Sequence, residues 1–448
     1  MRKTIQRYVQ VGRYPAFRRF WLGMMISRAG DAFTVVALSW VVLDLAGPLP
    51  LGVVLMCFGL PRAASGPVAG RILDRSDPRL LMAADNAVRG LLIAVVPVLL
   101  WLHHLVVADL YPIAVASALL SAVTEVAEAS LVPRMVDDED LESANSLLAA
   151  NWEFATIVGP ALAGVIVAAA GAGFALLLDA VSFAVMSALC LGLPAFGPVQ
   201  RRAAPVPRRA APVPRRAAPV QRRAAPVQRR AAPVQRLNGR RDWLGPGILL
   251  RFPAVLVLTA CSVGMLCLDG IVTVLYPVYC RTFLHVGAAG YGILLSAAGL
   301  GALLGVVAGA GLFGRLPPWS RIGAVIACGA PPFGLLRFAP DLPVAATLLG
   351  LATFGWGPYF AFDRTLVQRL VPDDLRGTLA GARMTISSAG FPLGSAIGGA
   401  LIGAVGVPAM ILAIAAAYLA LGSLPVLTAG LRAYPGARPL AGAGQNAD

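Results

Sequence analysis

The strongest constraint on this chain is a succession of long apolar segments. A bilayer core about 30 Å thick is crossed by a helix of roughly 20 predominantly apolar residues. Twelve segments have about this length: 20–45, 50–70, 80–102, 110–132, 145–170, 174–194, 253–277, 288–313, 321–338, 343–363, 379–404 and 408–430. The first follows basic residues, but it is too long for a signal peptide, so we expect it to be retained. The sequence predicts an all-α polytopic membrane protein with twelve transmembrane helices.

The charge of the chain is concentrated in one repeated segment. The net charge is +15, but thirteen arginines and no acid lie between Arg201 and Arg241, so subtracting them leaves only +2 for the remainder. Residues 201–236 repeat the unit RRAAPV followed by Pro or Gln. Proline every seventh residue excludes a continuous helix, and self-repelling Pro-rich sequence is typically extended and disordered. The repeat has no aromatic residue for stacking on bases, so we expect no nucleic-acid partner.

This segment is interpreted as a linker that tolerates repeat expansion. An alternative is that its arginines contact anionic lipid, at about 1 kcal/mol per arginine. With the N-terminus inside, the inner segments hold 32 of the 37 basic residues and the outer loops hold two, Arg281 and Arg337. Because basic residues favour the cytoplasmic side, both termini and the linker are predicted to be cytoplasmic, in a bacterial plasma membrane.

The linker divides the chain into two halves that resemble each other. LVPRMVDDEDL (131–141) has a counterpart in LVQRLVPDDL (366–375), and GPALAG (159–164) has one in GFPLGSAIGG (390–399). A duplicated six-helix unit is a common plan of transporters, with the substrate path between the halves. The predicted order is a cytoplasmic N-terminus, a six-helix bundle, the linker, a second six-helix bundle and a cytoplasmic tail, at 1–19, 20–194, 195–250, 251–431 and 432–448.

A charged loop joins the second and third predicted helices. GRILDRSDPR carries the pattern GxxxDRxxxR on Gly70, Asp74, Arg75 and Arg79. Such a cluster can act as an inner-face latch that breaks as the halves rock apart, and the alternative is a basic loop that only sets topology. The corresponding segment of the second half, GRLPPWSR (314–321), has no aspartate.

At this loop the chain resembles the major facilitator superfamily, and more closely its drug:proton antiporter branch, which contains macrolide efflux and enterobactin exporter proteins. The similar segments are FWLGMMISRAGDAF (20–33), the loop, LVPRMVDDEDLESANSL (131–147), LLDAVSF (177–183) and TLVQRLVPDDLRG (365–377). The resemblance implies two pseudo-symmetric six-helix bundles, a monomer, and a cavity lined by helices one, four, seven and ten. The long repetitive linker departs from the family pattern.

Charged residues inside the predicted helices are the candidate site, because they cost a few kcal/mol each in a bilayer. Asp31, Glu125, Glu128 and Asp269 fall near mid-depth and are candidates for proton coupling or substrate contact. Glu125 and Glu128 share a helix face, where repulsion favours holding a proton. Three arginines, Arg28, Arg62 and Arg89, lie within helices. Arg28 could pair with Asp31 as a structural ion pair, and Arg62 and Arg89 could neutralise acids or bind an anionic substrate. Asp179, near the outer end of helix six, is interpreted as structural.

Helix five contains Gly159, Pro160 and Gly164. In antiporters of the superfamily a Gly-Pro motif in this helix is associated with export. The alternative is a plain packing kink, because small residues permit close helix approach and proline bends helices.

The residue inventory excludes several kinds of site. Three histidines and six scattered cysteines predict no metal site, and the only lysine, Lys3, provides no ATP-binding loop, so no cofactor is expected. No segment is long enough for a soluble catalytic domain, so we expect no enzyme. The leading hypothesis is a proton-coupled exporter of a small amphipathic molecule such as an antibiotic. The alternatives are an exporter of a siderophore or other self-made metabolite, a lipid translocator, and a non-transporting scaffold or receptor.

Overall fold

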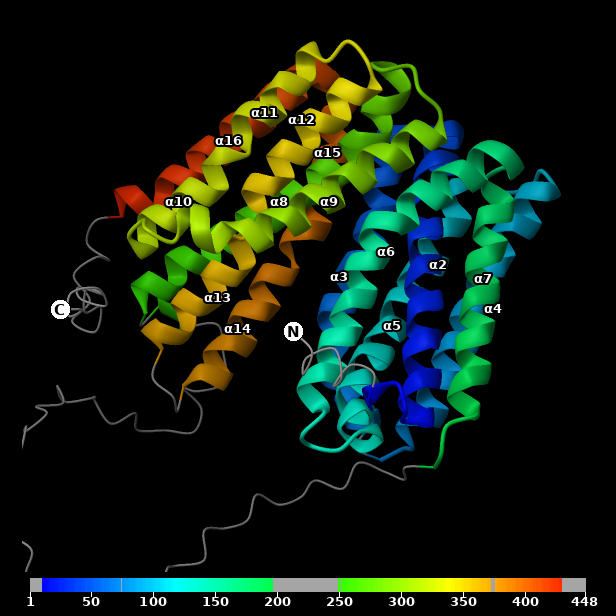
Figure 1. The fold of residues 1–448 in the computed structure, drawn as a ribbon. Coiled ribbons are helices and arrows are strands. Elements are labelled where there is room, and N and C mark those ends of the chain that lie inside the picture. Colours follow the sequence, from blue (N-terminus) through cyan, green and yellow to red (C-terminus); the bar gives the residue numbers. More distant parts are fainter. Residues whose placement is uncertain (1–9, 74, 196–248, 251, 372–374, 429–448) are drawn as a thin grey trace, which may run out of the picture.

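The computed structural model describes residues 10–73, 75–195, 249–250, 252–371 and 375–428. Helices form two bundles, and no strand occurs in this part of the chain (Figure 1). The N-terminal bundle contains α2 (Pro15–Ala46), α3 (Pro48–Leu73), α4 (Pro78–Trp101), α5 (Val107–Met135), α6 (Leu141–Ala170) and α7 (Ala172–Leu191). The C-terminal bundle contains α8 (Pro253–Thr282), α9 (Ala288–Phe313), α10 (Pro318–Cys328), α11 (Ala330–Leu335), η2 (Leu336–Phe338), α12 (Leu342–Trp356), α13 (Tyr359–Leu370), α14 (Arg376–Ser388), α15 (Gly390–Val405) and α16 (Val407–Leu427).

These elements make twelve membrane crossings. Ten helical segments of the described chain are long and apolar enough to span a bilayer, including Leu342–Leu370, which joins α12 to α13, and Arg376–Val405, which joins α14 to α15. The other two crossings are α3 and the run α10–α11–η2, which is interrupted at Gly329. The predicted all-α, twelve-helix fold is confirmed. The repeat at 201–236 lies outside the described residues.

Tight glycine turns mark the duplication. Gly171 separates α6 from α7 and Gly406 separates α15 from α16, with φ of 86° and 78°. A side chain is strained at such angles, whereas glycine adopts them freely. Each turn joins the last two crossings of its bundle, so the two halves repeat the same turn at the same place.

Glycines also bring the bundles together. An added Cβ at Gly292 of α9 would lie 3.1 Å from the Cα of Gly164 in α6, and one at Gly399 of α15 would lie 3.1 Å from the Cα of Gly52 in α3. The bundles therefore touch through two close crossings, α6 with α9 and α3 with α15, as small residues permit. Away from these crossings, toward α13 and α14, the ribbons of the two bundles diverge (Figure 1).

Candidate functional site

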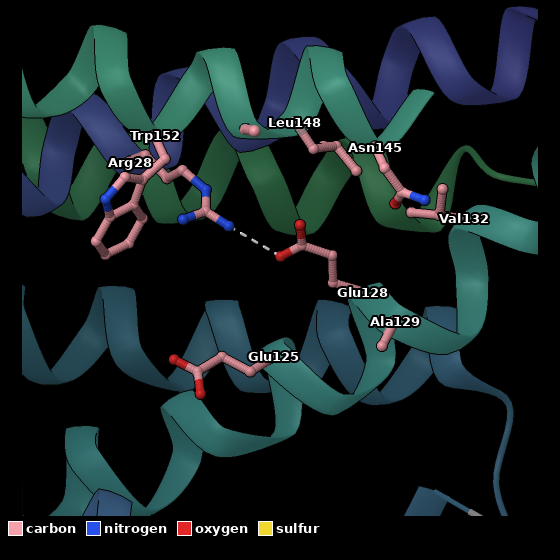
Figure 2. A pocket seen from close by; sticks show the side chains of 9 residues that line it. Arg28, Glu125, Glu128, Ala129, Val132, Asn145, Leu148 and Trp152 are labelled. Carbon is pink, nitrogen blue, oxygen red and sulfur yellow. Dashed lines mark hydrogen bonds and ion pairs between the residues drawn. The ribbon is translucent and has the colours of Figure 1, made fainter. Parts of the chain in front are cut away.

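The two glutamates of α5 line one cavity. Glu125 and Glu128 are three residues apart, which places their side chains on the same helix face. Together with residues of α2 and α6, among them Arg28 and Trp152, they surround a cavity of about 410 Å³. Figure 2 shows the two carboxylates on one side of this space and Arg28 with Trp152 on the other. The guanidinium of Arg28 lies 5.0 Å from the centre of the Trp152 ring, a cation–π distance. The cavity thus offers acidic, basic and aromatic groups together.

Each glutamate has its own arginine. Arg28 Nη2 donates to Glu128 Oε2 at 2.9 Å, and both side chains are 19% exposed. Arg62 of α3 pairs with Glu125, and both of these side chains are about half exposed, at 49% and 48%. The expected pair of Arg28 with Asp31 is therefore replaced by a pair between helices. Residues 28 and 31 share a face of α2, but the carboxylate of Glu128 reaches the guanidinium from the opposite wall.

Asp31 is joined to the third intramembrane arginine. Arg89 Nη2 of α4 lies 3.3 Å from Asp31 Oδ1, and its guanidinium lies 4.3 Å from the centre of the Phe183 ring. The Arg89 side chain is 14% exposed, whereas that of Asp31 is 49% exposed. All three predicted arginines thus neutralise acids. The three pairs connect α2 to α4, α2 to α5 and α3 to α5, so they tie the bundle together through charge.

Asp269 and Asp179 have opposite surroundings. Asp269 lies near the middle of α8, and no hydrogen bond or ion pair joins its carboxylate to another described residue. Asp179 of α7 is 1% exposed, and its carboxylate accepts hydrogen bonds from Thr34 and Ser182. The hydrogen bonds of Asp179 agree with a structural role for this residue. The carboxylate of Asp269 is left available to a proton or a substrate.

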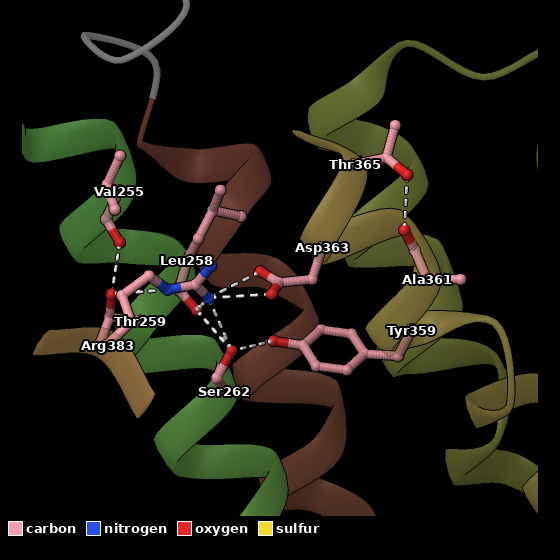
Figure 3. Close-up of polar contacts among 9 residues, drawn as sticks. All are labelled: Val255, Leu258, Thr259, Ser262, Tyr359, Ala361, Asp363, Thr365 and Arg383. Carbon is pink, nitrogen blue, oxygen red and sulfur yellow. Dashed lines mark hydrogen bonds and ion pairs between the residues drawn. The ribbon is translucent and has the colours of Figure 1, made fainter. Parts of the chain in front are cut away.

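The C-terminal bundle holds a buried charge network that the sequence did not reveal. Arg383 Nη2 donates to both carboxylate oxygens of Asp363, at 3.0 and 2.9 Å, and also to Ser262 Oγ at 3.0 Å (Figure 3). Asp363 and Arg383 stand at or near the ends of predicted spans, where charges are ordinary. In the structure α13 continues to Leu370 and α14 begins at Arg376, so both residues lie inside helices. A prediction that these two helices extend beyond their apolar stretches would have placed Asp363 and Arg383 inside helices.

The loop between α3 and α4 is described only in part. Asp74 lies outside the described residues, and Gly70 stands near the end of α3. Arg75 is exposed in a turn, whereas Arg79 Nη1 donates to the carbonyl of Leu193 at 2.6 Å, just after α7. Arg79 thus contacts its own bundle. Asp77 caps α4 by accepting a hydrogen bond from the Arg79 amide at 3.0 Å.

The glycines of α6 make close contacts on two sides. An added Cβ at Gly159 would lie 2.6 Å from that of Ala32 in α2, within the bundle, whereas Gly164 faces α9 of the other bundle. Helix α6 continues through Pro160. The segment therefore packs closely both within and between the bundles, which agrees with the packing interpretation and leaves the association with export a prediction.

Comparison with known proteins assigns the family. Residues 20–395 match the family model described as Major Facilitator Superfamily. The chain belongs to the major facilitator superfamily. This major facilitator chain is 26% identical over 413 residues to the multidrug efflux pump Tap of Mycolicibacterium fortuitum, covering 90% of this chain and 93% of the relative.

Solved structures agree at the level of the fold. The crystal structure of the nucleoside transporter NupG superposes with a TM-score of 0.67 at 14% identity, covering 94% of this chain and all of that one. A bacterial homologue of the human lysosomal transporter Spinster, in an inward-facing and unoccupied conformation, gives a TM-score of 0.64 at 13% identity, covering 93% and 94%. The chain is a multi-pass membrane transporter. The narrower resemblance to macrolide efflux and enterobactin exporter proteins stays a prediction.

Proposed function

We propose that this transporter exports a small amphipathic, drug-like molecule in exchange for protons. The observation that carries the proposal is the similarity to Tap multidrug efflux pumps over nine-tenths of both chains. The cavity supports it, because carboxylates, a guanidinium and an indole can hold a molecule that is part polar and part apolar. Export needs an energy source, and carboxyl groups inside the bilayer favour a proton gradient as that source.

Transport is proposed to proceed by alternating access. Because basic residues favour the cytoplasmic side, the charge pattern supports a cytoplasmic location for the linker, both termini and the ends of α13 and α14. With this orientation the bundles meet at the outer face and diverge toward the cytoplasm, so the described conformation receives substrate from inside. Rocking about the glycine crossings then exposes the cavity to the other side.

The charged residues have distinct proposed roles. Substrate that enters the cavity competes with Arg28 and Arg62 for Glu128 and Glu125. A carboxyl released from its arginine takes up a proton from outside after the bundles rock. Asp31 and Asp269 are further proton or substrate sites, and Arg89 neutralises Asp31. In the loop, Gly70, Asp74, Arg75 and Arg79 are proposed to latch the inner face when it closes. The protein is proposed to act as a monomer, and the arginine repeat to contact anionic lipid.

The test is substrate-driven proton release from proteoliposomes. Glu125→Gln and Glu128→Gln should each lower proton release per substrate, because an amide cannot carry the proton. Glu142→Gln, an exposed residue in the first turn of α6, is the matched control and should behave as the wild type. Full antiport in both cavity variants would refute the proton-carrying role of Glu125 and Glu128. Export that continues in the presence of a protonophore would refute proton coupling itself.

A further inference from the structure

Asp85, a further carboxyl group of the N-terminal bundle, is buried without an ion-pair partner among the described residues. Asp85 of α4 is 3% exposed. Its Oδ2 accepts a hydrogen bond from the hydroxyl of Thr124 in α5, whereas its Oδ1 is buried with no hydrogen-bond partner among the described residues. No ion pair links it to a basic side chain of the described chain. A charged carboxylate in this position would be left largely uncompensated, which is costly in a dry interior.

The surroundings of Asp85 contain one shared guanidinium. The polar and titratable groups of this region come from four helices: Asp31 and Thr34 of α2, Asn86 and Arg89 of α4, Thr124 of α5, and Asp179, Ser182 and Cys190 of α7. The charge of Arg89 acts on both Asp85 and Asp179, but its ion pair is with Asp31. Asp85 and Asp179 therefore depend on the same cation, Arg89, whereas Asp31 also lies within reach of the charge of Arg62.

The three carboxyls are not equivalent. Asp31 holds Arg89, and Asp179 accepts hydrogen bonds at both of its oxygens. Asp85 alone has one satisfied oxygen and one orphaned oxygen. By hydrogen bonding, Asp85 therefore carries the least stabilised charge of the three, and a proton on it removes that charge.

Arg89 is placed to change partners. It follows Asp85 by four residues on α4, and acid and base at this spacing lie on the same helix face and can pair. Its Nε is buried and has no hydrogen-bond partner among the described residues, and its contact with Asp31 is long, at 3.3 Å. The guanidinium thus has both an unused donor and a weak existing bond.

We propose that Asp85 is a proton-binding site and that its ionisation competes with Asp31 for Arg89. When the O–H bond of Asp85 breaks, Arg89 moves from Asp31 to the new carboxylate of Asp85. The proton passes to Asp31, whose carboxylate Arg89 has released, and the half-exposed Asp31 then gives it to water. The total charge of Asp85, Asp31 and Arg89 does not change while the proton passes between the two carboxyls, and it falls by one when Asp31 gives the proton to water. The tie between α2 and α4 is broken. The site rests on the proposed proton-coupled export, for which it supplies a store of protons behind the cavity.

Infrared spectroscopy of the full-length protein in liposomes tests the assignment, because a protonated carboxyl has a C=O band separate from that of a carboxylate. At neutral pH the wild type should show a band from a shielded carboxylic acid. Asp85→Asn should lose this band, Asp85→Glu should retain it at a shifted position, and Asp179→Asn and Glu142→Gln should retain it unchanged.

Each outcome decides one question. A band unchanged in Asp85→Asn, or lost only in Asp179→Asn, would overturn the site. Because Asp85→Glu keeps an ionisable group, a folding defect in the asparagine variant would not leave the assignment open. Protonophore-insensitive export together with an Asp85 band would refute the proposed function and retain the site. Protonophore-sensitive export without that band would support the proposed function and refute the Asp85 site.

Discussion

Arg281, in the last turn of α8, forms an ion pair with Asp44, near the end of α2, and so joins the two bundles beyond their glycine crossings. The Arg281 guanidinium also lies 6.0 Å from the centre of the Trp40 ring. Both charged side chains are partly exposed, at 43% and 49%. An alternating-access cycle that opens this end must break the pair.

Removing this pair should shift the conformational equilibrium modestly. An exposed ion pair contributes about 0.2–1 kcal/mol, so Asp44→Asn should change the ratio of the two conformations by at most about fivefold. Spin labels at exposed positions 139 and 377, in a background without native cysteines, would report the separation of the opposite ends. The charge-reversed pair Asp44→Arg with Arg281→Asp should restore the wild-type distribution. Identical spin-label distance distributions in the wild type, Asp44→Asn and the charge-reversed pair would show that the ion pair does not hold the ends of α2 and α8 together.

The two cavity ion pairs should differ in their effect on stability. Arg28 and Glu128 are mostly buried, and loss of one partner of a buried pair costs about 3–5 kcal/mol. Arg62 and Glu125 are half exposed, where the value is about 0–1 kcal/mol. Thermal unfolding in detergent should show a larger loss for Arg28→Ala than for Arg62→Ala. The double variant Arg28→Ala with Glu128→Ala should recover part of that loss, and equal losses for the two single variants would contradict the ranking.

The network of the C-terminal bundle should behave as one unit. Asp363→Asn leaves Arg383 buried with hydroxyl and carbonyl partners only, and we expect a loss of about 3–5 kcal/mol. The double variant Asp363→Asn with Arg383→Gln should lose much less than the sum of the single variants, as groups in one network do. Unfolding midpoints of the two single variants and the double variant measure this coupling. Additive losses would show that Asp363 and Arg383 act independently.

The glycine crossing between α6 and α9 should be intolerant of side chains. Gly164→Val adds atoms against the backbone of α9, so the bundles should separate at this point and transport should fall while each bundle stays helical. Gly403→Ala is the matched control, because an added Cβ at Gly403 meets nothing within 4 Å. Transport assays and circular dichroism on both variants distinguish a loss of transport from a loss of helical structure. Normal transport by Gly164→Val would show that the crossing of α6 and α9 tolerates a side chain and would contradict the prediction.

Deletion of residues 201–236 distinguishes a transporter from a scaffold. We expect export to continue at a comparable rate, because the candidate site lies wholly in the helices. A scaffold that docks through the arginine arm would lose function on deletion and tolerate Glu125→Gln and Glu128→Gln. Substrate accumulation in cells that express the full chain, the deletion and the two variants measures both.

The charged residues of the candidate site could be picked out from the sequence, but their pairing could not. Glu125 and Glu128 were expected to share a face, and they line one cavity. Helical spacing also suggested Arg28 with Asp31, and this was wrong as a partnership because both residues face neighbouring helices that supply other charges. Asp85, Asp363 and Arg383 were missed, since their importance comes from burial and from partners between 20 and 125 residues away.

The sequence by itself determined the class of fold, the number of crossings and the division into halves, because insertion into a bilayer depends on the length and hydrophobicity of each segment taken separately. The charge asymmetry of the loops and the paired motifs are also local properties of the chain. Only the tertiary structure decided which charges neutralise each other, which carboxyls are left without a cation, and where glycines bring the bundles into contact. Those outcomes depend on how helices rotate and cross, which is set by side chains from several helices at once.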